Sequence, residues 1–292
     1  MKFVLFFLLL VPAIHIFGQP NNASVSLGII ADCQYADQPT RGLRHYKNSI
    51  TKLEECVSTF NDQELHHVFH LGDFIDDGAA NFLPVQRIID KLVAPFTHVL
   101  GNHDYSVADS LKPGVHKKMG MPSRYFAQDV MGWRFLILDG NDVSLHANPK
   151  SSKLYRRAKR HHERHYPELP TWNGALGKSQ MKWLKAELKQ AEEQEIPVIL
   201  LCHFPVYPSD VHNLWNDEEV VALIERYSIV KAWLNGHNHA GNYGVKSGIH
   251  FVTFKGMVDT NENAFAHVSI GQEVIKIRGF GREENRELRI RK

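Results

Sequence analysis

The chain has 292 residues, of which 43% are hydrophobic and 23% are charged. Such a composition is typical of a soluble globular protein, and it excludes a disordered or an integral membrane chain. The formal net charge of +2, with histidines counted as neutral, is too small to indicate a general binder of nucleic acid or of membrane surfaces. The 18 histidines are numerous enough to include metal ligands.

The N-terminus has the features of a cleaved secretion signal. Lys2 precedes an apolar run over residues 3–11, and Gly18 is a small residue of the kind that precedes a signal peptidase cut. This run is shorter than the ~20 apolar residues of a membrane span, and no later segment is long enough to cross a bilayer. We therefore expect residues 1–18 to be a signal peptide and the mature protein to be exported, either periplasmic or secreted.

Residues 19–292 are expected to form a single domain, in which short apolar runs alternate with longer amphipathic stretches. This alternation is typical of strands and helices in an α/β sheet. The first predicted elements are a strand over 25–31, a helix over 44–60, a strand over 67–71, a helix over 82–93 and a strand over 97–100.

A hairpin and further strand–helix units follow in the sequence. Residues 125–130 and 133–139 flank Met131-Gly132, a pair that fits a tight turn between two strands. The remaining predicted elements are a helix over 180–194, a strand over 197–202, a helix capped by Asp217 and ending at Tyr227, and strands over 229–234, 249–254, 264–270 and 274–278. Parallel units followed by a block of strands predict two sheets packed face to face with helices outside.

One segment has a biased composition. Residues 156–165 include five arginines and lysines but only one acidic residue, Glu163. We interpret this charge run as a solvated face or loop. Attraction of a phosphate-bearing substrate is the alternative.

Polar side chains follow five of the predicted strands, at the point where each strand ends. Ligands of open α/β sheets bind beyond the carboxyl ends of the strands, so a site is expected there. The segments are Asp32-Cys33-Gln34, Gly72-Asp73-Phe74-Ile75-Asp76, Gly101-Asn102-His103-Asp104, Cys202-His203-Phe204-Pro205 and Gly236-His237-Asn238-His239.

These strand ends offer oxygen and imidazole nitrogen, a ligand set that suits Mn, Fe, Zn or Mg. The candidate ligands are Asp32, Gln34, Asp73, Asn102, His203, His237 and His239. One ion cannot use all seven and leave room for a substrate. Two divalent ions ~3.5 to 4 Å apart can, if one carboxylate bridges them, and Asp73 is the expected bridge.

The ordered motifs D-x-Q, G-D-x-x-D, G-N-H-D, H-F-P and G-H-x-H resemble those of the calcineurin-like metallophosphoesterases. They span residues 32 to 239, within a predicted motif core of 25–255. The resemblance implies a metal-dependent phosphohydrolase with a four-layer α/β/β/α sandwich, in which helices flank two mixed sheets. It also implies two metal positions, one with Asp32, Gln34, Asp73 and His239, the other with Asp73, Asn102, His203 and His237.

Glutamine stands at position 34, where most members of that superfamily carry histidine. Glutamine at this position is similar to the branch of manganese-dependent ADP-ribose/CDP-alcohol diphosphatases. Four further stretches also resemble that branch: residues 28–37, 173–175, 205–208 and 279–282. The resemblance implies cleavage of the diphosphate bond of a small nucleotide-derived substrate, not of a nucleic acid. Two divalent ions, manganese first and Fe, Zn or Mg as alternatives, would make hydroxide available near neutral pH.

Other side chains are expected to act on the substrate. The resemblance implies that His103 acts on the leaving group, and Asp76 is a carboxylate that would orient it. Arg41 and Arg44 could meet a phosphate, although a loop salt bridge explains them nearly as well. Tyr35 would either stack on a nucleobase or pack at the mouth of the site.

Two other functions are compatible with these residues. A general phosphodiesterase or phosphomonoesterase would use the same metal core on a different ester. A catalytically inactive binding scaffold would be expected to lack some ligands, whereas all seven positions are filled.

Overall fold

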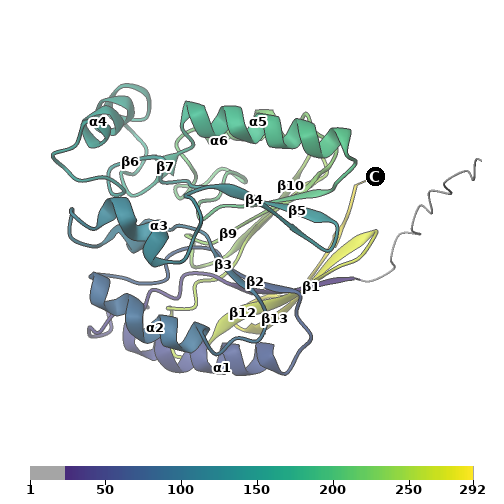
Figure 1. The fold of residues 1–292 in the computed structure, drawn as a ribbon, viewed down its shortest axis with the longest axis horizontal. Coiled ribbons are helices and arrows are strands. Elements are labelled where there is room, and N and C mark those ends of the chain that lie inside the picture. Colours follow the sequence, from purple (N-terminus) through teal and green to yellow (C-terminus); the bar gives the residue numbers. More distant parts are fainter. Residues whose placement is uncertain (1–23, 292) are drawn as a thin grey trace, which may run out of the picture.

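The computed structural model describes residues 24–291, so the predicted signal peptide at 1–18 lies outside the described residues. Within that range, two six-stranded sheets pack face to face, and helices cover the outer side of each (Figure 1). The predicted four-layer α/β/β/α arrangement with two mixed sheets is therefore confirmed.

The first sheet has the strand order β14-β13-β12-β1-β2-β3. The pairs β1–β2 and β2–β3 are parallel, and the later strands join antiparallel. Its strands are β1 (Val25–Ile30), β2 (His67–His70), β3 (Phe96–His98), β12 (Ala264–Ile270), β13 (Val274–Gly281) and β14 (Arg286–Arg289).

The second sheet has the order β10-β11-β9-β8-β5-β4, with a parallel centre from β5 to β11. Met131 and Gly132 both have positive φ, at 49° and 82°, and form the predicted hairpin turn between β4 and β5. Its strands are β4 (Phe126–Val130), β5 (Trp133–Ile137), β8 (Val198–Leu201), β9 (Val230–Asn235), β10 (Asn242–Lys246) and β11 (Ile249–Thr253). A separate two-stranded sheet pairs β6 (Val143–Ser144) with β7 (Gly174–Ala175).

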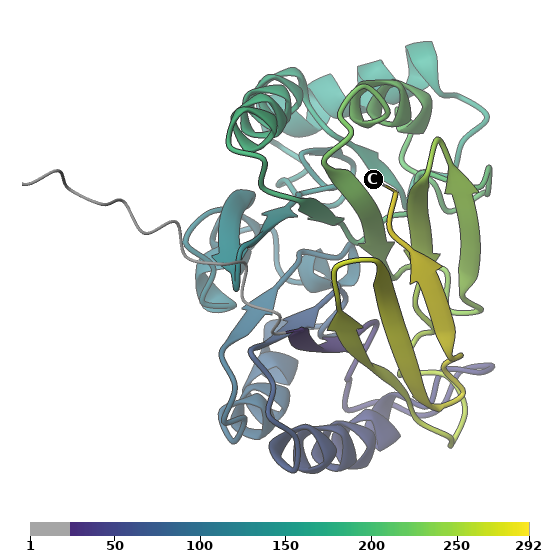
Figure 2. The same cartoon turned by 90° about the vertical axis from the view of Figure 1, so that its right-hand side faces the viewer.

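The helices lie in two outer layers. Helices α1 (Ser49–Asn61) and α2 (Phe82–Ile89) cover the first sheet, and α5 (Lys178–Glu193) and α6 (Asp217–Ile224) cover the second, as both Figure 1 and Figure 2 show. The short α3 (Val115–Lys118) and α4 (Lys153–His165) lie toward one end of the layers. No helix among the described residues is long and apolar enough to cross a membrane.

The two-residue period of the strands separates the core into layers. In β5, Phe135 and Ile137 belong to the larger buried cluster, which includes residues of both sheets, whereas Leu136 packs in the cluster that α5 and α6 complete. In β8, Ile199 belongs to the larger cluster, and the neighbouring Val198 belongs to the cluster under α5 and α6. Both faces of these central strands are thus buried, which makes the sheets a rigid support for the loops at their ends.

Several local predictions were wrong. No helix was predicted over residues 156–165, but they belong to the helix α4, where Ser152 caps the N-terminus and accepts a hydrogen bond from the Tyr155 amide at 3.1 Å. The charge run is a solvated face of this helix, in line with the first of its two interpretations. Asp217 is the first residue of α6, and Asn216 occupies the cap position, although its side chain pairs with the backbone of Leu176 rather than with the helix backbone. The strands β10 and β14 were also missed, since both lie at sheet edges and lack the apolar run that indicates a buried strand.

Candidate dinuclear metal centre

The carboxyl ends of parallel strands lie level at one edge of each sheet. In the first sheet, the register pairs Ile30 with His70 and His70 with His98, so the loops after β1, β2 and β3 begin side by side. In the second sheet, Leu201 pairs with Leu234, which aligns the loops after β8 and β9. Because the two sheets pack together, the polar residues of five distant segments can meet at this edge.

Four of the seven candidate ligands have a left-handed backbone. The positive φ angles are 49° at Asp32, 42° at Gln34, 58° at Asp73 and 70° at His237. This conformation is uncommon for residues other than glycine, so neighbouring contacts must hold it. The amides of Asp32 and Gln34 donate to the carbonyls of Gly72 and Asp73, at 3.2 and 2.8 Å. The first two loops are thereby fixed against each other.

The first group of predicted ligands forms a continuous set of contacts. Gln34 Nε2 lies 2.9 Å from Asp73 Oδ2 and 3.3 Å from His239 Nε2. His239 Nε2 lies 3.5 Å from Asp32 Oδ1. Asp32 and Asp73 are fully buried, and Gln34 is nearly so. The structure therefore brings together all four residues that were predicted to share one metal.

The second group meets around His203. Its Nε2 atom lies 3.2 Å from Asn102 Oδ1, 3.1 Å from His237 Nδ1 and 3.2 Å from Asp73 Oδ2. Asp73, His203 and His237 offer ligand atoms that all lie within 4.8 Å of one another, a geometry that could hold a metal ion. One oxygen, Asp73 Oδ2, contacts a member of each group, which is the position that a bridging carboxylate requires.

Asp104, the last residue of the G-N-H-D motif, has a supporting position that sequence reasoning missed. Its buried carboxylate accepts hydrogen bonds from the amides of Asp73, Phe74, Ile75 and Gly101, at 2.8 to 3.4 Å. A side chain at Gly101 would collide with Asp73, so glycine is required where these loops approach. Burial and the charge of Asp73 raise the pKa of Asp104 to about 7. Asp104 thus ties the second and third ligand loops together.

The charges in the cluster are strongly coupled. Burial raises the pKa of Asp73, but His203 and His103 outweigh it and hold that pKa well below its usual range. For His203, burial lowers the pKa, yet Asp73 and Asp32 outweigh burial and raise it to about 9. A cation at this position must displace the proton of His203, so metal affinity is expected to fall as pH falls below 9.

The donor set fits divalent metal ions. The cluster offers carboxylate, amide and imidazole groups, and Gln34 Oε1 is buried without a hydrogen-bond partner among the described residues. A buried acceptor in this state is destabilising, and a cation would satisfy it. Asp73, His203 and His237 supply the mixed oxygen and nitrogen ligands of such a site.

Two further residues orient the histidines from outside the cluster. Asn173 Oδ1 lies 2.9 Å from His237 Nε2, and Asp259 Oδ1 lies 3.0 Å from His239 Nδ1. Contacts of this kind fix the ring orientation and the tautomer of a metal-binding histidine. Sequence reasoning quoted Asn173 only within a family-like stretch and missed Asp259, because a lone aspartate after a strand carries little specificity.

His103 and Asp76 lie as predicted, with His103 Nδ1 2.8 Å from Asp76 Oδ1. The His103 amide also donates to Asp73 Oδ1 at 2.7 Å, which anchors it to the cluster. Burial lowers the pKa of His103, but the charges of Asp73 and Asp76 outweigh burial and raise it. His103 can therefore hold a proton near neutral pH, as a donor to a leaving oxygen must.

A cavity of about 300 Å³ opens directly on the cluster. Its lining includes Arg44, one of the two arginines considered for a phosphate contact, together with Trp172 and His212, which sequence reasoning missed. Burial lowers the pKa of Arg44, while a hydrogen bond to Tyr46 and the charge of Asp73 outweigh burial and raise it. Arg44 is thus a stable cation in the lining of this cavity.

The structure does not bring the other two predicted substrate contacts into this lining. Tyr35 packs against the hydrophobic core, which agrees with the packing alternative, and Arg41 is exposed outside the lining. The backbone of Arg41 pairs with that of Arg44, so Arg41 stabilises the loop that carries Arg44.

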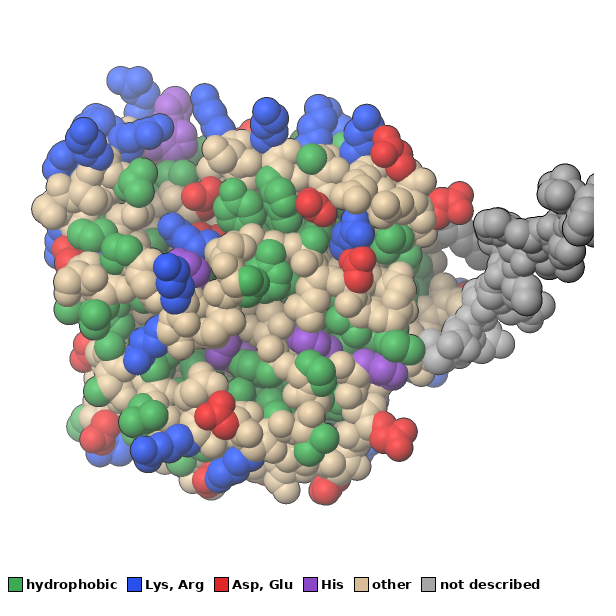
Figure 3. All heavy atoms as spheres, viewed as in Figure 1, with side chains coloured by type: hydrophobic (Ala, Val, Ile, Leu, Met, Phe, Trp, Pro, Cys, Tyr) green, Lys and Arg blue, Asp and Glu red, His purple; other side chains and the backbone are tan. Residues whose placement is uncertain are grey.

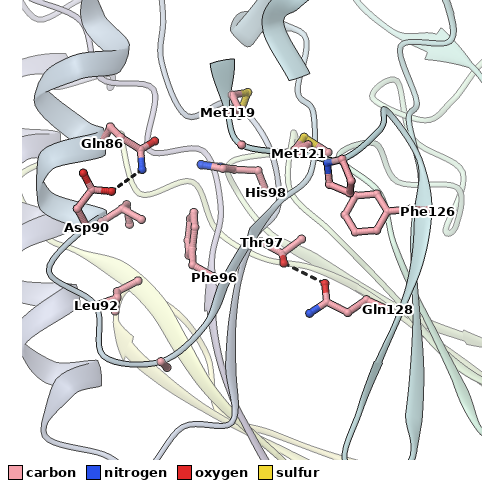
Figure 4. Close-up of a pocket in the computed structure, with 14 residues that line it drawn as sticks. Gln86, Asp90, Leu92, Phe96, Thr97, His98, Met119, Met121, Phe126 and Gln128 are labelled. Carbon is pink, nitrogen blue, oxygen red and sulfur yellow. Dashed lines mark hydrogen bonds between the residues drawn. The ribbon is translucent and has the colours of Figure 1, made fainter. Parts of the chain in front are cut away.

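A larger cavity of about 420 Å³ lies elsewhere, between α2, β3 and β4 (Figure 4). Phe96, Phe126, Met119 and Met121 contribute to its apolar walls, and His98 is its titratable nitrogen base. None of the seven candidate ligands lines this cavity. The chemistry therefore belongs to the smaller cavity, where buried charges and imidazoles converge.

The model of the family described as calcineurin-like phosphoesterase matches residues 25–241. The chain belongs to this family. As a calcineurin-like phosphoesterase it is a metal-dependent hydrolase, so the predicted enzyme class is confirmed. The matched range begins with β1 and ends in the loop after β9, so it contains all the predicted motifs at residues 32 to 239.

Two relatives of this phosphoesterase align with it over nearly their whole length, at less than 30% sequence identity. Proteins from Xenopus laevis and from Oryza sativa subsp. japonica, each named manganese-dependent ADP-ribose/CDP-alcohol diphosphatase, are 28% and 29% identical to it. These alignments cover 91% and 90% of this chain, and 90% and 93% of the relatives. A crystal structure of a dimetal phosphatase from Danio rerio superposes with a TM-score of 0.84 at 23% identity, over 91% of this chain and 99% of that one. The superposition confirms the fold.

Proposed function

We propose that this protein is a dinuclear-metal hydrolase that cleaves the diphosphate bond of ADP-ribose/CDP-alcohol-like nucleotides. The observation that carries the proposal is the contact of Asp73 Oδ2 with both groups of ligands, at 2.9 and 3.2 Å, beside a cavity lined by Arg44 and His103. The names of the relatives, which align over nearly their whole length, support the substrate class.

The proposed ligands are those predicted from the sequence. Asp32, Gln34 and His239 would hold one ion, Asn102, His203 and His237 the other, and Asp73 both. Manganese is the proposed metal, because the relatives are named manganese-dependent and the ligands are oxygen and imidazole nitrogen. When bound, the two ions lower the pKa of a water molecule and offset the charge of a phosphate.

The side chains of the cavity have separate roles in this proposal. Arg44 binds a phosphate oxygen with its guanidinium group, since the cation lies in the lining with Asp73 and His103. His103, oriented by Asp76 at 2.8 Å, donates a proton to the leaving oxygen. Trp172, which is 49% exposed in the wall of the cavity, provides an aromatic face at its entrance.

A substrate panel tests this proposal. Purified mature protein, loaded with manganese, is incubated with ADP-ribose and CDP-choline, and in parallel with p-nitrophenyl phosphate, bis-p-nitrophenyl phosphate and cyclic nucleotides. We expect kcat/KM to be highest for the two diphosphates, with a nucleoside monophosphate as one product. Faster turnover of the monoester or of the diesters would favour the alternative phosphoesterase activities and reject this substrate class.

We further propose that the protein is exported, on the basis of the charged and apolar segment at residues 1–18. Fractionation of the cells that make it, with N-terminal sequencing of the recovered protein, tests this. The expected product is outside the cytoplasm and begins at Gln19. A full-length cytoplasmic protein would reject export.

A further inference from the structure

The helix α4 presents one face to the molecule and a strongly basic face to solvent. Its buried residues are Ala158 and His162, and the His162 ring packs 4.7 Å from the ring of Trp215. A helix repeats every 3.6 residues, so the opposite face can be assigned from the sequence. That face carries the basic stripe: Lys153, Arg156, Arg157, Arg160 and Arg164, all of which are exposed.

Contacts within the protein do not account for the basic stripe. Among the ion pairs of residues 24–291, the one formed within α4 joins Lys159 to Glu163 at 3.7 Å, and none involves the stripe. Arg156 donates to the carbonyl of Ser151. Like charges three and four residues apart destabilise a helix, and Arg156, Arg160 and Arg164 have this spacing. Helix stability accounts for Arg164, a cation in the last turn, but not for the rest of the stripe.

The basic stripe is extended and convex. It spans 11 residue steps, or about 16 Å along the helix axis. In the space-filling view, lysine and arginine side chains gather along the upper edge of the molecule, over α4 and α5 (Figure 3). Such an edge matches a broad anionic surface better than it matches a single small anion.

Exposed apolar side chains accompany the stripe. Leu154 lies within α4, and Leu169 and Trp172 lie in the segment that follows it, with exposed fractions of 56%, 37% and 49%. A basic helix with apolar side chains beside it is typical of proteins that bind the interface of an anionic bilayer. Because Trp172 also lines the cavity of the metal cluster, docking through α4 would bring the cavity close to that interface.

We propose that the basic stripe of α4 docks the protein on an anionic phospholipid surface. The small net charge of +2 is compatible with this, because the stripe is local and acidic residues elsewhere offset it. Docking is peripheral and requires no membrane span. It also does not depend on the proposed hydrolysis, since binding can be measured without any turnover.

Co-sedimentation with vesicles tests the proposal. Full-length mature protein is mixed with vesicles of phosphatidylcholine alone or of equal parts phosphatidylcholine and phosphatidylglycerol, at low and at high salt. The variant is Arg157→Gln/Arg160→Gln/Arg164→Gln. The control is Arg87→Gln/Lys91→Gln/Arg278→Gln, which removes three exposed cations from the layer of the first sheet and changes the net charge equally. All six replaced side chains are exposed, so both proteins should fold, and circular dichroism checks this.

We expect the wild-type protein and the control to sediment with the anionic vesicles at low salt and to be released at high salt. The stripe variant should bind at least about tenfold more weakly. The proposal is overturned if the wild-type protein stays in solution, or if the control loses as much affinity as the stripe variant. It is also overturned if heparin or single-stranded DNA binds the stripe while anionic vesicles do not, because the partner would then be a polyanion.

Discussion

The two cavities of this protein differ in what lines them rather than in how large they are. The cavity of about 420 Å³ lies at the side of the strands, and apolar side chains alternate in its walls with the polar pairs Gln86–Asp90 and Thr97–Gln128. His98 is the imidazole in its lining. The cavity of about 300 Å³ lies at the carboxyl ends of the strands, and its lining includes Asp73, His237 and His239. Their volumes alone would assign the site to the wrong place.

The difference has a physical origin. The walls of the larger cavity come from the sides of α2, β3 and β4, where apolar side chains such as Ile89 and Phe96 pack in or against the hydrophobic core. The smaller cavity is bordered by loops with left-handed backbone at Asp32, Gln34, Asp73 and His237. Strained backbone and buried charge both oppose folding, so their coincidence indicates a function. Substitutions in the smaller cavity should therefore lower activity, whereas a substitution in the larger cavity should leave activity unchanged and alter stability.

The largest effect is expected for Asp73→Asn. Loss of the shared carboxylate should lower kcat/KM at least about a thousandfold, because bound ions supply several kcal/mol of transition-state stabilisation. The measurement is turnover of the best substrate at saturating manganese. The matched control is Asp62→Asn on the surface beyond α1, which should keep full activity. Residual activity within tenfold of wild type would show that Asp73 does not join two ions.

His103→Gln should lower kcat by about 10² to 10⁴-fold, since it removes a proton donor held 2.8 Å from Asp76. Manganese affinity should change little, because His103 is outside the proposed ligand set. Asp76→Asn should have a smaller effect on kcat and should shift the pH profile of kcat. Equal losses with nitrophenyl substrates, whose leaving group needs no proton, would contradict this role.

Asn173→Ala and Asp259→Ala should each weaken manganese binding or activity by about 10 to 100-fold. These residues contact His237 at 2.9 Å and His239 at 3.0 Å, and they touch no other member of the predicted ligand set. Calorimetric titration of the metal-free protein gives the affinity. Unchanged manganese binding in both variants would mean that the two histidines are not metal ligands.

The smallest effect on activity is expected for His98→Asn in the larger cavity, where turnover should stay within about twofold of wild type. Its signature is instead in stability. Burial lowers the pKa of His98 to about 3, against 6.5 for an exposed histidine. Between these values the unfolded chain binds a proton that the folded chain does not, so stability falls as pH falls.

The His98→Asn variant should lose the part of the pH dependence of stability that comes from His98. Between pH 6.5 and pH 4.5, the free energy of unfolding of the wild type should fall by roughly 2 kcal/mol more than that of His98→Asn. Urea denaturation at the two pH values measures this difference. Identical pH dependence in the two proteins would mean that His98 carries a proton in the folded state.

The ligand set could be predicted from sequence because each member follows a strand within a short motif. The predicted elements also placed most strands and both pairs of outer helices. Asn173 and Asp259 could not be found in this way, since their importance depends on contacts with histidines 64 and 20 residues away. Tyr35 was ambiguous because a residue beside a ligand can face either the cavity or the core. The helix α4 was missed because its amphipathicity rests on charge, with only Ala158 and His162 buried.

The number and the position of the bound metal ions decide whether the site is dinuclear. Metal-free protein is equilibrated with manganese, the bound metal is counted, and the ions are located by anomalous diffraction from crystals of the loaded protein. We expect two ions per chain, ~3.5 to 4 Å apart, with the carboxylate of Asp73 in contact with both. A single ion, or two ions of which one lies away from Asp73, would contradict this expectation.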